Sequence, residues 1–360
     1  MIDLPLQRHA LLALLAAALF GASAPLSKLL LDGMGPLSLA GLLYLGSGAG
    51  LFLVWMLRRR VPGWRAPEAP LAGRDWLWLA GAVLSGGIAA PALLLWGLSG
   101  MPASGASLLL CTEGVLTTLI AALAFREAVG ARVWLAGALM LAAGAMLAWN
   151  PSGSSGAGTA PADLALHALA IVTACAMWGL DNNLTRPISG GDPVVIAMAK
   201  GLVAGTANLL LAGLAGEQWP AGAFVTGALA LGSLAYGASL TCYILALRHL
   251  GSARTASHFG TAPFIGALLS VLLLGEPMGL ALGVAGGLML LATWLVLDER
   301  HEHEHQHQYI EHAHLHTHDE HHQHAHDGSE GPEPHAHAHA HAPLRHSHPH
   351  LPDLHHRHGH

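Results

Sequence analysis

The chain has 360 residues, of which 53% are hydrophobic and only 11% are charged, and its mean hydropathy is +0.47. These values exclude an ordinary soluble domain and place the chain in the membrane class. The net charge of −6 belongs to the last 60 residues, because residues 1–300 contain nearly equal numbers of basic and acidic side chains. The chain has no basic region that would indicate nucleic acid as a partner.

Ten long apolar segments follow one another in residues 1–300. A helix needs roughly 20 apolar residues to cross a bilayer, and no soluble core requires ten such segments in succession. Arg8 and the apolar run after it also resemble a signal peptide, but the run continues to Leu31, so we interpret it as a retained helix. The predicted spans cover about 9–31, 36–57, 75–97, 102–125, 130–149, 163–186, 193–215, 221–247, 252–274 and 278–297.

The second five segments repeat the pattern of the first five. Gly179 corresponds to Gly21 at an offset of 158 residues, and Glu276 corresponds to Glu127 at an offset of 149. Because each half contains an odd number of spans, the halves must cross the membrane in opposite directions. The sequence therefore predicts an all-α membrane protein with ten transmembrane helices in two inverted five-helix repeats. The expected parts are a first repeat at 1–149, a linker at 150–162, a second repeat at 163–298 and a tail at 299–360.

Basic residues predict the orientation of the chain. Of the thirteen Lys and Arg residues at loops and chain ends, twelve fall on one set of alternate loops, and only Lys28 falls on the other. Basic residues accumulate on the cytoplasmic side of membrane proteins. We therefore expect an integral protein of the inner or plasma membrane with both termini in the cytoplasm.

Inverted repeats of this kind generate alternating-access transporters, whose substrate site lies near the midplane where the halves meet. No loop is long enough to hold a soluble catalytic domain. We therefore expect a transporter of a small molecule rather than an enzyme, embedded in the lipid bilayer. An inert helical scaffold or a membrane-embedded enzyme is the alternative interpretation.

Five motifs carry a family resemblance: Phe20-Gly21-Ala22-Ser23 with Lys28, Trp178-Gly179 with Arg186, Ala253-Arg254-Thr255-Ala256-Ser257, Thr261-Ala262-Pro263-Phe264 and Leu274-Gly275-Glu276-Pro277. Together they resemble the drug/metabolite transporter superfamily, specifically its EamA-type ten-helix transporters, over about residues 1–298. The resemblance implies a bundle of two inverted repeats that exports small metabolites, amino acids or drugs, often coupled to an ion gradient. In one departure, the fourth span has Glu113-Gly114 where the family commonly has Glu-Pro.

Ionisable residues inside the spans are costly to bury, so each is a functional candidate. Glu113 lies near the middle of the fourth span, where an isolated ionised carboxylate is disfavoured. We expect it to be protonated, paired or hydrated. It could bind a proton or a cationic substrate, or it could be a protonated group bonded between helices. His258, in the ninth span, is either a packing residue or a partner of Glu113 across the repeat interface.

Further polar residues lie near the ends of the sixth and seventh spans. Asp181 and Lys200 are predicted to form an ion pair, which offsets the cost of burying either charge alone and is mainly structural. Trp178, Asn182 and Asn183 could complete a polar entrance with Asp181. Three tyrosines are further candidates for the lining of a pathway: Tyr44, Tyr236 and Tyr243.

Small residues in the spans are interpreted as packing elements. The three cysteines lie inside predicted spans without a CxxC spacing, so we expect no disulfide framework. Glycine pairs with GxxxG spacing permit close helix approach within the bundle and are also compatible with a homodimer. These pairs are Gly46/Gly50, Gly201/Gly205 and Gly283/Gly287.

The tail after Arg300 has a different composition. Of the last 60 residues, 23 are His, and they commonly alternate with Glu, Gln or Ala. Almost no apolar residue is present, so we expect the tail to be disordered. Neutral imidazole ligates Zn, Ni, Co and Cu ions, and we expect the tail to bind such ions, with no other cofactor required. The predicted ligands are His301, His303, His305, His307, His312, His314, His316, His318, His335, His337, His339 and His341.

Two functions follow from these features. One is a small-metabolite exporter whose tail buffers or senses metal; the other is a divalent-metal transporter whose tail captures or delivers the ion. The spans favour the first, because they lack the repeated His and Asp clusters that a dehydrated divalent ion needs. The tail favours the second, and a metal-storage or scaffold protein is a third interpretation.

Overall fold

The computed structural model describes residues 4–60, 71, 73–125, 131–149, 161–188, 192–250, 255 and 258–297, and in the tail residues 301–306, 310–316, 335–341 and 345–350. The first half comprises α1 (Leu4–Gly21), α2 (Ser23–Leu30), α3 (Pro36–Arg60), α4 (Asp75–Ala82), the π-helix η1 (Val83–Ala89), α5 (Ala90–Gly100), α6 (Ala103–Leu109), α7 (Thr112–Phe125) and α8 (Ala131–Trp149). The second half comprises α9 (Pro161–Thr185), the 3₁₀ turn η2 (Arg186–Ile188), α10 (Pro193–Leu214), α11 (Gly222–Leu231), the π-helix η3 (Gly232–Ala238), α12 (Ser239–Leu250), α14 (Ala262–Leu274) and α15 (Leu280–Leu297).

Apolar helices make up the bundle, as the sequence predicts. Seven helical stretches are long and apolar enough to cross a membrane: His9–Leu30, Pro36–Arg60, Asp75–Gly100, Ala103–Leu123, Ala162–Thr185, Val194–Leu214 and Gly222–Tyr243. Three shorter apolar helices cover Ala131–Leu147, Ala262–Leu274 and Leu280–Leu295. These stretches correspond in position to the ten predicted segments, and the count of ten crossings stays a prediction.

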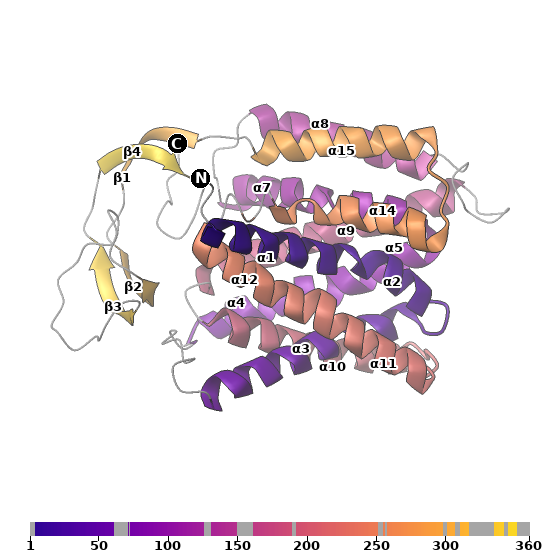
Figure 1. Cartoon of the computed structure of the whole chain (residues 1–360), viewed down its shortest axis with the longest axis horizontal. Helices are drawn as coiled ribbons and strands as arrows, with labels where there is room; N and C mark the ends of the chain where they lie inside the picture. The colour runs from indigo at the N-terminus through magenta and orange to yellow at the C-terminus, as the bar shows by residue number, and fades with distance from the viewer. Residues whose placement is uncertain are drawn as a thin grey trace.

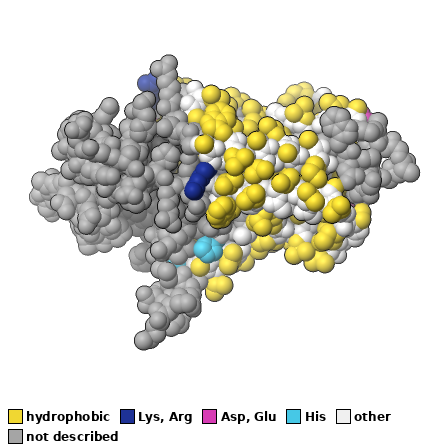
Figure 2. All heavy atoms as spheres, turned by 90° about the horizontal axis from the view of Figure 1, so that it is seen from above, with side chains coloured by type: hydrophobic (Ala, Val, Ile, Leu, Met, Phe, Trp, Pro, Cys, Tyr) yellow, Lys and Arg dark blue, Asp and Glu magenta, His cyan; other side chains and the backbone are white. Residues whose placement is uncertain are grey.

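The helices lie side by side along the long axis of the molecule (Figure 1), and α1 begins at the same end of the bundle at which α15 ends. Hydrophobic side chains cover the flank seen in Figure 2. Many large hydrophobic side chains of the bundle are exposed, among them Leu214 at 86% and Leu280 at 85%. The core lies between the halves, where Leu43, Leu109 and Ile171 are fully buried. An apolar exterior around an apolar core suits lipid rather than water.

Glycines allow the closest helix contacts, but not all of the GxxxG pairs are used. A Cβ on Gly201 would lie 2.8 Å from Gly48 Cα, so α10 and α3 touch through their backbones. Gly46 and Gly205 also abut neighbouring helices, which confirms their predicted packing role. A Cβ on Gly283 or Gly287 of α15 would meet nothing within 4 Å, so this third pair has no packing role within the described bundle.

Several spans are distorted inside their apolar part. The first span breaks between α1 and α2 at Ala22, and the fourth breaks between α6 and α7 at Leu110 and Cys111. The third and eighth spans contain the π-helices η1 and η3, which begin at Val83 and Gly232, 149 positions apart. This is the offset of the sequence repeat, so both halves carry the same distortion. Such distortions free backbone groups and often mark functional sites.

The tail differs from the expectation of disorder in four segments. The strands β1 (His301–Gln306) and β4 (Arg345–His350) form one antiparallel pair, and β2 (Ile310–His316) and β3 (His335–His341) form another. An alternation of His with a second residue has the two-residue period of a strand, and pairing satisfies the backbone groups without an apolar core.

Candidate functional site

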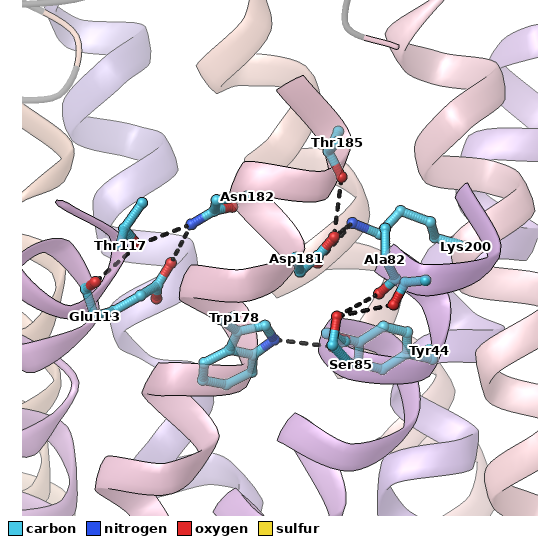
Figure 3. A network of polar contacts seen from close by, with 12 residues as sticks. Tyr44, Ala82, Ser85, Glu113, Thr117, Trp178, Asp181, Asn182, Thr185 and Lys200 are labelled. Atoms are coloured by element: carbon cyan, nitrogen blue, oxygen red, sulfur yellow. Dashed lines mark hydrogen bonds and ion pairs between the residues drawn. The ribbon is translucent and has the colours of Figure 1, made fainter. Parts of the chain in front are cut away.

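The C-terminal half of α9 carries four of the polar residues that the sequence singled out, and it directs them toward different neighbours (Figure 3). Successive helical residues are rotated by about 100°. Asn182 and Asn183 therefore reach α7, whereas Asp181 reaches α10. Trp178, about one turn earlier, reaches the π-helix η1. One helix of the second half thus connects polar groups on several other spans.

Glu113 lies in the first turn of α7, immediately after the break in the fourth span. Its Oε1 accepts a hydrogen bond of 3.1 Å from Asn182 Nδ2, which also lies 3.4 Å from Thr117 Oγ1. The N-terminal turn of a helix favours a negative charge. Asn182 is thus a partner of Glu113 across the repeat interface, and the predicted contact between Glu113 and His258 stays a prediction.

The predicted ion pair between Asp181 and Lys200 is present. Lys200 Nζ lies 2.5 and 2.6 Å from the two carboxylate oxygens, and Thr185 Oγ1 donates to Asp181 Oδ1 at 2.9 Å. Asp181 is only 6% exposed, so each charge depends on the other for compensation. Gly86 of η1 packs directly on this carboxylate, and a Cβ at Gly86 would overlap it.

Carbonyl groups of η1 form a second polar centre. Trp178 Nε1 and Tyr44 Oη both donate to the carbonyl of Gly86, at 3.0 and 2.8 Å. Asn208, which is fully buried, donates to the carbonyl of Gly87 at 2.9 Å. Asn208 is not among the residues predicted from the sequence, although an amide in the middle of an apolar helix is itself a signal. The π-helix thus turns backbone carbonyls toward side chains of α3, α9 and α10.

An aromatic chain joins the three predicted tyrosines. Ring centroids are 5.9 Å apart between Tyr44 and Tyr236, and 5.7 Å apart between Tyr236 and Phe20. Phe20 then contacts Phe259 at 5.5 Å, and Phe259 contacts Tyr243 at 5.0 Å. Offset and edge contacts at these distances are favourable. This series of rings therefore passes back and forth between residues of the two halves, and its two phenylalanines were not among the predicted lining residues.

The remaining predicted residues are His258 and the histidines of the tail. His258 lies at the break before α14, where its carbonyl accepts hydrogen bonds from Thr261 N and Oγ1. Of the predicted metal ligands, those on β1, β2 and β3 are placed only by their backbone, and His307 and His318 lie outside the described residues. Within the described part of the chain, no three His, Cys, Asp or Glu residues form a group that could hold a metal ion.

A bundle of apolar helices, with broken and π-distorted spans around polar groups from both halves, has the architecture of a polytopic membrane transporter. The model of the EamA-like transporter family matches residues 7–149 and 165–298. The chain belongs to this family, which confirms the resemblance seen in the sequence. It is therefore an integral membrane protein and a transporter.

Two similar proteins extend this comparison. The chain is 27% identical over 291 residues to an uncharacterized transporter of Methanothermobacter thermautotrophicus, and the match covers 78% of this chain and 83% of that protein. A crystal structure described only as that of a protein matches with a TM-score of 0.55 and 20% identity, over 80% of this chain and 95% of the other. The second likeness shows the fold alone.

Proposed function

We propose that this protein exports a small metabolite, an amino acid or a drug by alternating access. Its substrate or coupling ion binds in a polar layer between the halves, which comprises Glu113, Trp178, Asp181, Asn182 and Lys200. Both chain termini face the cytoplasm. The observation that carries the proposal is the hydrogen bond from Asn182 of the second half to Glu113 of the first, beside the break in the fourth span. A site between inverted repeats can be reached from either side of the membrane as the halves move.

The exposure of this layer supports binding over simple packing. Asn182 is exposed and Glu113 is only partly buried, although both lie in stretches apolar enough to cross a membrane. Polar side chains that meet lipid at this depth are costly, so we infer that both face a path open to water. Among the hydrogen bonds described for the chain, Glu113 uses Oε1 for Asn182, and Oε2 can accept a proton or a cationic substrate.

The His-rich tail supports a second candidate function, the transport of divalent Zn, Ni or Co ions. The tail holds 23 of the 27 His residues of the chain, and imidazole is a good ligand for these metals. In that account the tail captures or delivers the transported ion. In the exporter account the same tail binds metal as a buffer or sensor, outside the transport path.

Transport in reconstituted vesicles separates the two functions. Full-length protein and a version ending at Arg300 are tested against a panel of amino acids, cationic drugs and divalent metals. We expect an organic substrate to be transported by both versions, with metal responsiveness lost on truncation. Transport of metal ions alone, weakened by truncation, would instead establish the metal transporter.

The orientation has a separate test. Single cysteines are introduced into the tail and into the 150–162 linker, and intact cells are treated with a membrane-impermeant thiol reagent. We expect the linker to react and the tail to be protected, because the linker is predicted on the side opposite the basic loops. Labelling of the tail but not the linker would reverse the proposed orientation.

A further inference from the structure

Two glutamates in loops of the second half hold helix ends of the first half. Glu217, between α10 and α11, accepts hydrogen bonds from the backbone N–H groups of Leu37 and Ser38 at 3.0 and 2.8 Å, and from Ser38 Oγ at 2.6 Å. Its two carboxylate oxygens thus satisfy donors in the first turn of α3. The first N–H groups of a helix have no partner within the helix, and a carboxylate there is stabilising.

Glu276 repeats this arrangement at the fourth span. It lies between α14 and α15, and its two oxygens accept from Ala103 N at 2.7 Å and Ser104 N at 2.9 Å, in the first turn of α6. From the other side, Lys28 Nζ donates to the carbonyls of Leu98, Ser99 and Met101 at 2.5, 3.0 and 3.0 Å. The hairpin between α5 and α6 is therefore held at one end by a cation and at the other by a carboxylate.

The contacts of Glu217 and Glu276 lie at one end of the bundle and join the two halves. In Figure 1 it is the end at which α14 connects to α15. A cap inside a single half would stabilise its helix without affecting the movement of the halves. Alternating access moves the halves relative to each other. The hydrogen bonds between the carboxylates of the second half and the helix ends of the first must therefore break when this end opens. Hydrogen bonds to a charged group are among the stronger ones.

The backbone around the Glu217 contact is shaped to fit it. A Cβ on Gly35, in the turn before α3, would overlap the Glu217 carboxylate, so only glycine leaves room for the contact. Gly33, two residues earlier, packs in the same way against the ring of Phe224 on α11. The turn between the first two spans therefore packs closely against the second half and is also held there by hydrogen bonds to the Glu217 carboxylate.

We propose that Glu217 and Glu276 form a latch that closes this end of the transport path, and that both must leave the helix ends of the first half before the path opens there. The inference rests on the alternating-access function proposed above and goes beyond it by assigning gating residues remote from the polar layer. Under the proposed orientation, the latch is on the side opposite the cytoplasm.

A cysteine at position 107 reports on the latch. Ser107 lies one turn inside Ser104, is 1% exposed, and has a hydroxyl without a hydrogen-bond partner, so Ser107→Cys removes no described contact. It faces α14 of the second half, because a Cβ on Gly266 would lie 2.8 Å from its Oγ. Opening of this end separates α6 from α14 and exposes the thiol.

The experiment measures the rate at which a membrane-impermeant maleimide labels Ser107→Cys in a background whose three native cysteines are replaced by Ala. Vesicles of both orientations are used, so the latch side need not be assumed. Each of Glu276→Gln and Glu217→Gln should raise the rate roughly ten- to hundredfold. Gly35→Ala should raise the labelling rate as well, because the added methyl group displaces the Glu217 side chain while the charge of Glu217 is kept.

Gly213→Ala is the matched control, since a Cβ there meets nothing within 4 Å near the end of α10, and it should label like the parent. Unchanged labelling in folded Glu276→Gln and Gly35→Ala would overturn the latch, even if their unfolding midpoints fell. If the parent transports a substrate while these variants label normally, only the latch fails. If labelling rises but no panel compound is transported, the latch stands and the proposed function fails.

Discussion

The two halves carry the same distortions but different charges. The fourth span breaks before Thr112, and its repeat partner, the ninth, has turns at Gly260 and Thr261 before α14 begins at Ala262. At the offset of 149 residues, Glu113 in the first half corresponds to Ala262 in the second. The duplicated backbone therefore supplies two equivalent breaks, and only one of them receives a carboxylate.

Other positions show the same asymmetry. Asp181 corresponds to Ser23 at the offset of 158, and Gly86 of η1 corresponds to Ala235 of η3. The ion pair of Asp181 with Lys200, the exposed amide of Asn182 and the Gly86 carbonyl, which accepts two hydrogen bonds, all surround the C-terminal half of α9. Under the proposed function, the repeated spans form the transport path, whereas the departures from the repeat supply the polar residues of the site.

The largest effect on stability is expected at the buried ion pair of Asp181 and Lys200, where the second half departs from the repeat. Asp181→Asn leaves Lys200 without its partner and should lower the free energy of unfolding by about 3–5 kcal/mol, measured as a fall in the unfolding midpoint in detergent. Adding Lys200→Met removes both charges and should recover most of the loss. The partly exposed pair between Arg58 and Asp192, 3.7 Å apart, is the control, because Arg58→Gln should cost about 0–1 kcal/mol. Equal losses at the two pairs would contradict this account.

A smaller effect is expected at the π-helix. Gly86→Ala places a methyl group on the Asp181 carboxylate and should cost about 1–3 kcal/mol through overpacking. Its repeat partner Ala235 already carries a Cβ, so the constraint belongs to one half alone. Thermal unfolding of the variant checks it, and a stability equal to that of the parent would show that η1 can shift away from Asp181.

The third prediction concerns the open face of α15. Gly283→Ala meets no neighbour and should leave stability unchanged or raise it by about 0.5–1 kcal/mol, as expected for Ala in place of Gly within a helix. The measurements are the unfolding midpoint and the oligomeric state in detergent. A clear loss of stability together with loss of a dimer would show that this glycine stripe packs against a second copy of the chain.

The smallest effect on the fold is expected from removing the tail. Truncation after Arg300 should leave the unfolding midpoint of the bundle unchanged, because the predicted repeats end before it. The isolated 301–360 peptide should bind several Zn, Ni or Co ions at pH ~7.5 and lose them toward pH ~5, since an imidazole titrates at pH ~6.5 and must be neutral to ligate. Calorimetric titration that gives no heat with any metal at the higher pH would contradict the metal-binding role.

Much of this arrangement can be predicted from the sequence, because hydropathy and repeat offsets act over many residues. The apolar helices and the Asp181–Lys200 pair follow from the cost of exposing backbone and charge to lipid. The partner of Glu113 could not be predicted in the same way, because it depends on the rotation of α9 against α7. Local sequence also gives no reliable sign of a π-helix, whose register shift is decided by packing.

The latch and the tail show two further limits. Glu217 and Glu276 lie in loops, where an acidic side chain is ordinarily expected to face solvent. Only the folded structure places them over the helix ends of the other half. The tail was expected to be disordered from its lack of apolar residues. Its four strands are instead consistent with its two-residue alternation, a feature that the composition alone does not capture.

Transport by Glu113→Gln across pH is the most direct test of the central claim, that the departure from the repeat at Glu113 forms the substrate or proton site. The substitution keeps size and hydrogen bonding but removes titration. Thr118→Val is the control, because it changes a neighbouring polar side chain of the same helix. Thr118 Oγ1 donates to the Gly114 carbonyl, whereas it is the adjacent Thr117 whose Oγ1 lies within reach of Asn182. We predict that Glu113→Gln inserts normally but transports far less, or without pH dependence, while the control behaves like the parent. Parental transport by Glu113→Gln at every pH would contradict the account and make Glu113 a structural residue.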